Sequence, residues 1–417
     1  MRYGLIGEKL GHSFSKLIHE QLCDYTYDLI PLARDEVDGF LARREFAAIN
    51  VTIPYKETVI PYLAFIDPAA QAIGAVNTVV NRGGLLYGYN TDFAGIEYLL
   101  DRHGFVLEGK KVLILGSGGT CKTASAVARR RGARELYVVS RTAGEGRISY
   151  EQAMAAHADA DVLINTTPVG MYPNLDARPI DLAAFPQLLA VVDVIYNPLR
   201  TALLQQADAL SIPNCNGLEM LVAQAKYAAE RFTGAQLPDE CIAQVHAQLR
   251  ADRKNLALIG MPSCGKSTVG QILAQQMGKK FVDLDERIVQ RAGKSIVDIF
   301  AEVGEAGFRA QEKEALRQVA GQTGLVIATG GGVIKDADNV RLLRHNSAIC
   351  FIDRDLENLI PSDPARPLSS GYEAVRTMYE QRLPLYRGYA DFIVENNGEI
   401  SCTVQQIREK FYETACS

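Results

Sequence analysis

The sequence lacks the features that mark membrane-spanning, secreted or nucleic-acid-binding proteins. Its 417 residues contain no run of about 18 or more apolar residues, and the apolar start at residues 3–6 is too short for a signal peptide. The formal net charge of −5 provides no basic excess for nucleic acid or an anionic membrane. We therefore expect a cytoplasmic location and neither a nucleic-acid nor a membrane partner.

Cysteine and histidine occur in no metal-binding or disulfide pattern. None of the eight cysteines forms a C-x-x-C pair, and the six histidines are scattered. This spacing predicts neither a zinc site nor a disulfide framework, so we expect reduced thiols. The sequence also has no internal repeat and no proline- or glycine-rich spacer. A chain of this length is then expected to fold as two or three globular domains.

Two patterns of a strand, a glycine-rich loop and a helix are present. Apolar residues 111–115 precede the first loop, and apolar residues 256–259 precede the second, which runs over residues 260–267. Each pattern predicts the first βα unit of a nucleotide-binding α/β domain. Charged residues 248–255 lie between them and are the predicted module boundary. Further apolar runs predict another α/β subdomain ahead of the first loop, at residues 3–6, 47–53 and 76–80.

The first glycine loop and the strand after it indicate a dinucleotide. Glycine-rich turns let backbone amides approach a pyrophosphate at a helix N-terminus. Cys121 stands where the third glycine of G-x-G-x-x-G would fall, so a tight structural turn is the alternative. Apolar residues 136–139 then end in Ser140-Arg141-Thr142. An NAD enzyme usually has an acidic residue there, whereas a guanidinium suits a 2′-phosphate, and the sequence therefore favours NADP.

Polar residues gather in the first hundred positions. Ser13 and Ser15 precede a helix-like stretch and could cradle a carboxylate or simply cap the helix. Lys56 follows Asn50-Val51-Thr52, and a partly desolvated lysine can act in proton transfer. Each alone is more often a turn or cap residue. Together with Asn77, Asn90 and Asp92 they predict a pocket for a small polyol.

In its motifs this first module resembles shikimate dehydrogenase. From residue 3 to about residue 245 the chain carries, in order, G-H-S-x-S, N-V-T-x-P-x-K, G-A-V-N-T, N-T-D-x-x-G, N-x-T-P-x-G-M, D-x-x-Y-x-P and G-x-x-M-L-x-x-Q-A. It departs from the family at Ser140, where Asn usually precedes Arg-Thr; the extra basic residue would be Arg147. The resemblance implies NADP-dependent chemistry without a metal.

The resemblance also implies roles for individual residues. Lys56 and Asp92 would be the catalytic pair, and Ser13 and Ser15 would hold the substrate carboxylate. Further substrate contacts would be Thr52, Asn77, Tyr196 and Gln224. The cofactor-binding residues would be Gly116, Ser117, Gly118, Gly119, Thr120, Ser140, Arg141, Thr142, Val194, Gly217 and Met220.

The second glycine loop fits G-x-x-x-x-G-K-[ST], which cradles nucleotide phosphates with backbone amides. Lys266 would reach the terminal phosphates, and Ser267 would ligate Mg²⁺. Asp283 and Asp285 follow the next apolar run and could serve the metal and a hydroxyl. A triple glycine at 330–332 permits close approach to backbone. The nucleotide-binding residues predicted from this loop are Ser263, Cys264, Gly265, Lys266, Ser267 and Thr268.

Residues 256–400 resemble shikimate kinase. The P-loop, D-x-D, G-E-x-x-F-R-x-x-E, G-G-G, R-P-L and R-x-P-L-Y occur in the family's order. The resemblance assigns Asp283 and Ser267 to Mg²⁺ and gives Arg366, in a loop suited to a mobile lid, to ATP. It assigns to shikimate Asp285, Arg309, Gly331 and Arg382. An adenylate- or gluconate-type kinase is the nearest alternative.

The sequence thus predicts an α/β protein with a two-subdomain dehydrogenase, whose NADP subdomain is a Rossmann fold, followed by a P-loop kinase with a parallel sheet and lid. The implied function is reduction of 3-dehydroshikimate with NADPH, then phosphorylation of shikimate by ATP with Mg²⁺. The alternatives are a catabolic, NAD-linked quinate or shikimate dehydrogenase and a ligand-sensing protein with degenerate enzyme folds. The expected modules are residues 1–252, with 1–100 and about 219–248 for substrate and 101–218 for NADP, and residues 255–417.

Overall fold

The computed structural model describes residues 2–11, 13–144, 146–359 and 372–416. The chain forms two compact units, each with its own core. Unit 1 comprises Met1–Met171, Ala177–Tyr196 and Thr201–His246, and unit 2 comprises Tyr172–Asp176, Asn197–Arg200 and Ala247–Ser417. None of the described helices is both long enough and apolar enough to cross a bilayer.

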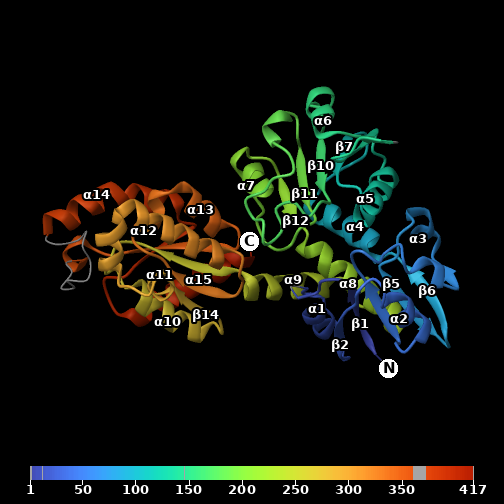
Figure 1. The fold of residues 1–417 in the computed structure, drawn as a ribbon, viewed down its shortest axis with the longest axis horizontal. Helices are drawn as coiled ribbons and strands as arrows, with labels where there is room; N and C mark the ends of the chain where they lie inside the picture. The colour runs from blue at the N-terminus through green and yellow to red at the C-terminus, as the bar shows by residue number, and fades with distance from the viewer. Residues whose placement is uncertain (1, 12, 145, 360–371, 417) are drawn as a thin grey trace. The chain divides into compact units, whose positions relative to one another are not determined.

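The first sheet of unit 1 has the strand order β2-β1-β3-β5-β6-β4, and Figure 1 labels β1, β2, β5 and β6 of it. Its strands pair in parallel except β5, which is antiparallel to both β3 and β6. The strands are β1 (Tyr3–Gly7), β2 (Tyr27–Pro31), β3 (Ala48–Val51), β4 (Phe65–Ile66), β5 (Thr78–Arg82) and β6 (Leu85–Tyr89). The helices of this part are α1 (Ser15–Leu22), α2 (Val37–Arg43) and α3 (Pro68–Ile73).

The second sheet of unit 1 has the order β12-β11-β10-β7-β8-β9, and all its strands pair in parallel. Helices cover both faces, which explains why β7, β10 and β11 are fully buried, apolar runs rather than alternating ones. The strands are β7 (Lys111–Leu115), β8 (Glu135–Val139), β9 (Arg147–Ile148), β10 (Val162–Asn165), β11 (Ala190–Asp193) and β12 (Asn214–Asn216). The helices are α5 (Gly119–Arg130), α6 (Tyr150–Ala156) and α7 (Ala202–Ala209).

Helices α4 (Thr91–His103) and α8 (Leu218–Thr233) pack against each other and join the two sheets of unit 1. They approach closely at Gly95, where a Cβ atom would lie 2.9 Å from the carbonyl oxygen of Met220 and 3.1 Å from Cβ of Gln224. Helix α8 also packs on α1 and β5. The start of α4 and the middle of α8 are thereby held at the same place beside the first sheet.

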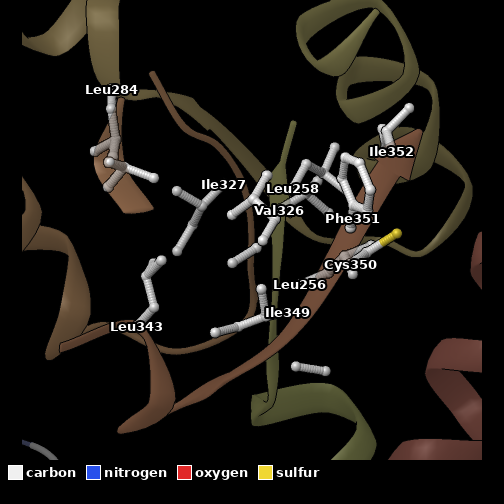
Figure 2. Packing of buried hydrophobic residues seen from close by; sticks show 14 of the residues in the cluster. Leu256, Leu258, Leu284, Val326, Ile327, Leu343, Ile349, Cys350, Phe351 and Ile352 are labelled. Atoms are coloured by element: carbon white, nitrogen blue, oxygen red, sulfur yellow. The ribbon is translucent and has the colours of Figure 1, made fainter. Parts of the chain in front are cut away.

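Unit 2 is built on one parallel sheet with the order β14-β15-β13-β16-β17. Its core side chains come from the central strands and the helices over them, as Figure 2 shows for the strand residues Leu258 and Phe351 and the helix residue Leu343. The strands are β13 (Asn255–Ile259), β14 (Lys280–Asp283), β15 (Leu325–Ala328), β16 (Ser347–Asp353) and β17 (Phe392–Glu395). The helices are α10 (Lys266–Gln276), α11 (Leu284–Ala292), α12 (Ile296–Ala320), α13 (Ala337–Arg344), α14 (Tyr372–Tyr389) and α15 (Ile400–Cys416). The division between the units falls within α9 (Glu240–Arg253).

His19 in α1 is fully buried and makes unit 1 sensitive to acid. Its ring stacks on Tyr27 with centroids 4.1 Å apart, and Nδ1 lies 2.7 Å from the hydroxyl of Tyr25. Burial lowers the pKa of His19 to about 3, against about 6.5 for an unfolded histidine. Between these values the unfolded chain binds the extra proton, so stability falls as the pH drops through 6.5 and levels off below 3.

We predict that His19→Phe removes this part of the acid sensitivity. At pH 4.5 the free energy of unfolding of unit 1 in the wild type should be about 2–3 kcal/mol lower than at pH 7. Each pH unit between the unfolded and folded pKa of His19 contributes about 1.4 kcal/mol. Amide hydrogen exchange in β1 and β2, recorded at increasing urea concentrations, measures the free energy of unfolding of wild type and variant at the two pH values. A parallel pH dependence in both proteins would contradict the assignment.

Candidate active sites

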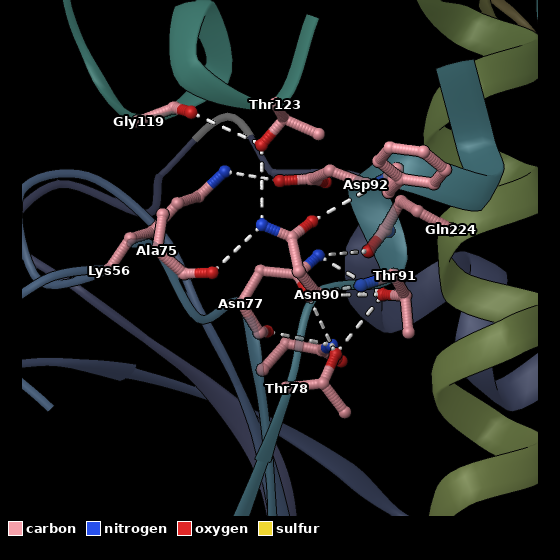
Figure 3. A network of polar contacts seen from close by, with 12 residues as sticks. Lys56, Ala75, Asn77, Thr78, Asn90, Thr91, Asp92, Gly119, Thr123 and Gln224 are labelled. Atoms are coloured by element: carbon pink, nitrogen blue, oxygen red, sulfur yellow. Dashed lines mark hydrogen bonds and ion pairs between the residues drawn. The ribbon is translucent and has the colours of Figure 1, made fainter. Parts of the chain in front are cut away.

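Lys56 and Asp92 form a largely buried ion pair in unit 1. Lys56 lies in the turn after β3, and Asp92 lies in the first turn of α4. The Nζ atom of Lys56 is 2.5 Å from Oδ2 of Asp92, and their side chains are 13% and 9% exposed (Figure 3). A carboxylate at this distance holds the ammonium in one direction, which is the arrangement needed to deliver a proton to one atom of a ligand.

A network of amide and hydroxyl groups adjoins this pair (Figure 3). Asn77 accepts from the backbone amide of Thr91 at 2.7 Å, and its Nδ2 atom donates to Thr91 Oγ1 at 3.1 Å and Gln224 Oε1 at 3.4 Å. Asn50 donates to the carbonyl oxygen of Asn77 and accepts from Tyr27. The structure therefore brings Asn77, just before β5, and Gln224, in α8, to the N-terminus of the helix that carries Asp92.

Asn90 has a positioning role that the sequence did not reveal. Its side chain caps α4 by accepting from the amide of Phe93 at 3.2 Å. Its Nδ2 atom donates to the carbonyl oxygen of Ala75 at 2.9 Å and to Thr123 Oγ1 at 3.2 Å. Thr123 lies in α5, directly after the dinucleotide loop, so Asn90 ties that helix to the start of α4. The motif N-T-D-x-x-G offered a signal, since asparagine is a preferred N-cap.

The two predicted carboxylate-binding serines lie together at the start of α1. Ser13 Oγ is 3.1 Å from Ser15 Oγ and accepts from the amide of Ser15 at 3.2 Å. Between them, Phe14 packs on Tyr196 with ring centroids 5.2 Å apart. Burial raises the pKa of Tyr196 to about 12, so its hydroxyl is a neutral hydrogen-bond donor at physiological pH. Thr52 lies in the turn after β3, with its amide bonded to the carbonyl oxygen of Ile6.

The first glycine loop lies directly beside Lys56. A Cβ atom at Gly119, the first residue of α5, would lie 3.4 Å from Cδ of Lys56. Gly116 has φ of 112°, a conformation that favours glycine, and Gly118 is the N-cap of α5. The start of α5 therefore lies beside the Lys56–Asp92 pair, and Ser117 and Thr120 belong to the same turn.

The predicted 2′-phosphate residues follow β8. Ser140 is buried, and its hydroxyl donates to the carbonyl oxygen of Thr142 at 2.5 Å, which fixes the turn. Arg141 and Arg147 are exposed on either side of a loop that backbone hydrogen bonds close between Gly144 and Arg147. Within the described residues no ion pair holds either guanidinium. The residues present thus fit a phosphate placed at the end of β8.

Other residues of the family motifs are structural. Asp193 is fully buried and accepts from Thr201 Oγ1 at 2.7 Å, Asn165 Nδ2 at 2.9 Å and the amide of Ile195 at 3.1 Å. Burial raises the pKa of Asp193 to about 7, opposed by these donors. The network joins the ends of β10 and β11. Next to it, a Cβ atom at Gly217 would collide with the carbonyl group of Val194, so both predicted cofactor residues lie side by side.

In unit 2 most of the residues predicted to bind the nucleotide and shikimate line a cavity of about 580 Å³. Lys266 donates to the carbonyl oxygens of Gly260 at 2.9 Å and Met261 at 2.8 Å. Ser267 Oγ is 2.6 Å from Oδ2 of Asp283. A hydroxyl and a carboxylate in contact are hard oxygen ligands, so this pair fits Mg²⁺. The predicted residues that line the cavity are Ser263, Gly265, Lys266, Ser267, Thr268, Asp283, Asp285, Arg309, Gly331 and Arg382.

Two residues predicted to bind the nucleotide are not among those that line the cavity. The thiol of Cys264 is buried beneath the loop rather than in the cavity lining, and its carbonyl oxygen accepts from Asn396 Nδ2 at 2.9 Å. Any contact of Cys264 with a nucleotide is therefore through its backbone. Arg366 lies outside the described residues.

Glu312 is a residue of this cavity that the sequence did not single out. It is fully buried on α12, three residues after Arg309, and its Oε2 atom lies 2.8 Å from Nη1 of that arginine. Burial raises the pKa of Glu312, opposed by the charge of Arg309. Its other oxygen, Oε1, has no hydrogen-bond partner among the residues that the structure describes. The spacing in F-R-x-x-E was the available signal, because residues three apart share a helix face.

The triple glycine leaves room for these side chains. A Cβ atom at Gly330 would lie 2.7 Å from Oε1 of Glu312 and 3.0 Å from Oδ1 of Asp285, and one at Gly332 would collide with the guanidinium of Arg309. Gly331 accepts from Nη1 of Arg382 at 3.0 Å. The glycines therefore let the cavity's own charged groups approach the backbone, in addition to any ligand.

Comparison with known proteins agrees with this division. The family model for the shikimate dehydrogenase substrate binding domain matches residues 5–79, and the model for shikimate kinase matches residues 262–414. A shikimate dehydrogenase (NADP(+)) of Clostridium beijerinckii is 36% identical over 255 residues, which are 57% of this chain and 94% of that protein. The chain belongs to the shikimate dehydrogenase family. It also carries a shikimate kinase domain.

Solved shikimate dehydrogenases have the same fold as the N-terminal part. The enzyme of Peptoclostridium difficile matches with a TM-score of 0.56 at 33% identity, covering 60% of this chain and 98% of that one. The Thermus thermophilus enzyme, in complex with NADP(H) and shikimate, matches with a TM-score of 0.54 at 30% identity, covering 60% of this chain and 99% of that one. A chorismate mutase/shikimate 5-dehydrogenase fusion of Clostridium acetobutylicum matches at 0.56 and 32%, covering 59% and 96%.

The close contact between α4 and α8 should matter for the dehydrogenase. We predict that Gly95→Ala, by pushing α8 away, separates Gln224 from Asn77 and lowers dehydrogenase kcat/KM by roughly tenfold or more, since misplacement by about 1 Å can cost 100-fold. Gly39→Ala is the matched control, because a Cβ there meets only Arg43, at 3.5 Å, within helix α2. Steady-state kinetics of both variants decide; equal activities would show that α8 adjusts without cost.

Proposed function

We propose that this bifunctional chain reduces 3-dehydroshikimate to shikimate with NADPH in unit 1 and phosphorylates shikimate to shikimate 3-phosphate with ATP in unit 2. The observation that carries the proposal is the presence in one chain of two separate polar sites. The Lys56–Asp92 pair beside a dinucleotide loop supports the first reaction. The P-loop cavity containing Asp285, Arg309 and Arg382 supports the second. We propose modules of residues 1–252 and 255–417, which divide the chain where α9 ends and before β13 begins.

In unit 1 the residues of the chain stabilise the negative charge that develops on the reacting oxygen and supply its proton. NADPH supplies the hydride when bound. As the carbonyl oxygen gains negative charge, the ammonium of Lys56 stabilises it and transfers a proton, while Asp92 keeps that ammonium oriented. Ser13 and Ser15 bind the carboxylate, and Asn77, Gln224, Thr52 and Tyr196 bind ring hydroxyls or the carboxylate. Neutral donors around the ring leave the Lys56–Asp92 pair as the charged group at the reacting end.

The phosphate-binding loop after β8 supports a preference for NADP. Arg141, between the hydroxyls of Ser140 and Thr142, can bind the 2′-phosphate in a bidentate manner, and Arg147 adds a second positive charge. The similar shikimate dehydrogenase of Clostridium beijerinckii is named for NADP(+), which supports the same preference.

We predict that Arg141→Ala raises KM for NADPH about tenfold or more and leaves KM for NADH nearly unchanged, because a charge-assisted contact to phosphate is lost only with the first cofactor. Arg134→Ala is the control, since Arg134 is exposed just before the same strand and pairs with Glu135. Initial rates at varied NADPH and NADH provide the test. Equal increases for both cofactors would assign Arg141 to the adenosine or to folding instead.

In unit 2 the chain positions the acceptor hydroxyl and neutralises phosphate charge. ATP supplies the phosphoryl group when bound, and Ser267 and Asp283 would hold its Mg²⁺. Lys266 would exchange its carbonyl partners for the phosphates, and Arg366 would add charge from outside the described residues. Asp285 would accept from the 3-hydroxyl. Arg309 and Arg382 would bind the carboxylate, with Gly331 beside them and Glu312 fixing the direction of Arg309.

The two proposed reactions can be separated by single substitutions. Supplied with 3-dehydroshikimate, NADPH and Mg-ATP, the pure protein should form shikimate 3-phosphate, detected by mass spectrometry. We predict that Lys56→Ala lowers dehydrogenase kcat by about 10²–10⁴ and leaves phosphorylation of added shikimate near the wild-type rate. Lys266→Ala should do the converse.

Comparable loss of both activities in either variant would contradict independent sites. Absence of shikimate 3-phosphate from the wild-type protein, with shikimate accumulating, would retain the dehydrogenase and reject the kinase.

A further inference from the structure

Arg354 is a cation of the unit 2 cavity to which no family motif assigns a role. It follows β16 directly and lines the cavity together with the P-loop. Its Nε atom is buried and has no hydrogen-bond partner within the described part of the chain. Among the described residues, no carboxylate lies within ion-pair distance of its guanidinium. The residue as a whole is only half-buried and lines the cavity, so the rest of its guanidinium can meet a ligand there.

The other cations of the cavity already have acceptors. Arg309 is paired with Glu312, Arg382 donates to the carbonyl oxygen of Gly331, and Lys266 donates to two carbonyl groups of its own loop. The neighbouring carboxylate does not serve Arg354 either. Asp353 accepts from the hydroxyl of Tyr379 at 3.2 Å and lies 3.6 Å from Nη2 of Arg387. Arg354 is thus a cation for which the described residues provide no counter-charge.

The sheet order places Arg354 on the other side of β13 from the residues proposed for the acceptor. Strand β13, which leads into the loop, lies between β15 and β16, and the residues proposed for the acceptor, Asp285 and Gly331, follow β14 and β15. Arg354 follows β16, on the other side. Figure 2 shows β16 running beside β13, and a Cβ atom at Gly260 would lie 2.6 Å from the carbonyl oxygen of Ile352.

We propose that Arg354 binds the polyphosphate chain of the nucleotide, an inference that rests on the kinase function proposed above. The acceptor acid has a single carboxylate, for which Arg309 and Arg382 are available. A nucleoside triphosphate brings several negative charges to the loop, and a guanidinium binds phosphate oxygens with two parallel hydrogen bonds. Arg354, at the end of β16, therefore adds its positive charge to that of Lys266, which follows the neighbouring strand β13.

The test compares nucleotides that differ in phosphate number. Isothermal titration of the full chain with Mg-ATP, Mg-ADP and AMP should show that Arg354→Met, which keeps the aliphatic stem, weakens ATP and ADP about tenfold or more and AMP less than threefold. Arg354→Lys, which keeps the charge, should recover part of the loss. In turnover, KM for ATP should rise while KM for shikimate stays within about twofold.

Arg376→Ala is the matched control, because Arg376 is exposed on α14 and pairs with Glu380 at 3.0 Å; all its affinities should equal those of the wild type. Equal weakening of AMP, ADP and ATP would place Arg354 against the base or ribose and overturn the proposal, as would a change confined to shikimate or no change at all. Titrations without acceptor keep this test separate from the proposed function, which fails if the wild-type protein does not phosphorylate shikimate.

Discussion

Both sites depend on places where two chain segments approach more closely than a Cβ atom would permit. In unit 1 Gly95 lets α8 lie directly against α4, so that Gln224 reaches Asn77 beside the Lys56–Asp92 pair. In unit 2 Gly330 lets the carboxylates of Glu312 and Asp285 share the edge of β15. Protein interiors are close-packed, so a methyl group at Gly95 has no void to enter, whereas one at Gly330 would displace the two carboxylates at the edge of the cavity. The polar geometry of each site is therefore a consequence of backbone packing.

Charge is handled differently in the two units. The described part of the first site pairs its lysine with one carboxylate and surrounds the pair with amides and hydroxyls, so the site is near neutrality before a ligand binds. The second site gathers lysine and arginine around a loop of backbone amides, as a site for a polyphosphate requires. In the proposed reactions the same small acid is recognised by neutral hydrogen bonds in unit 1 and by the guanidinium groups of Arg309 and Arg382 in unit 2, where the transferred group is a phosphoryl group.

Much of this arrangement can be predicted from the sequence because the relevant residues are close along the chain. The glycine loops, with the strands before them and helices after them, predicted β7–α5 and β13–α10, and parallel pairing explains their continuous apolar strands. The family motifs further indicated Lys56 and Asp92, which pair in unit 1, and most of the residues predicted for unit 2 that line its cavity. The family and its two enzyme types are confirmed by the comparisons, whereas the roles of single residues stay predictions.

What the sequence could not show are contacts made over long separations. Asn90 meets Thr123 across two subdomains, and segments Tyr172–Asp176 and Asn197–Arg200 belong to unit 2 although they lie within the first module's sequence. Arg354 illustrates the limit most clearly. In sequence it is one arginine between two aspartates, where surface charge is the ordinary interpretation. Only the fold shows that Asp353 turns to Tyr379 and Arg387, which leaves the guanidinium beside the phosphate loop without an anion from the described part of the chain. A charge pattern therefore becomes informative once the partners of each charge are known, since a half-buried cation that the described residues leave unpaired beside a cavity is available to an anionic ligand.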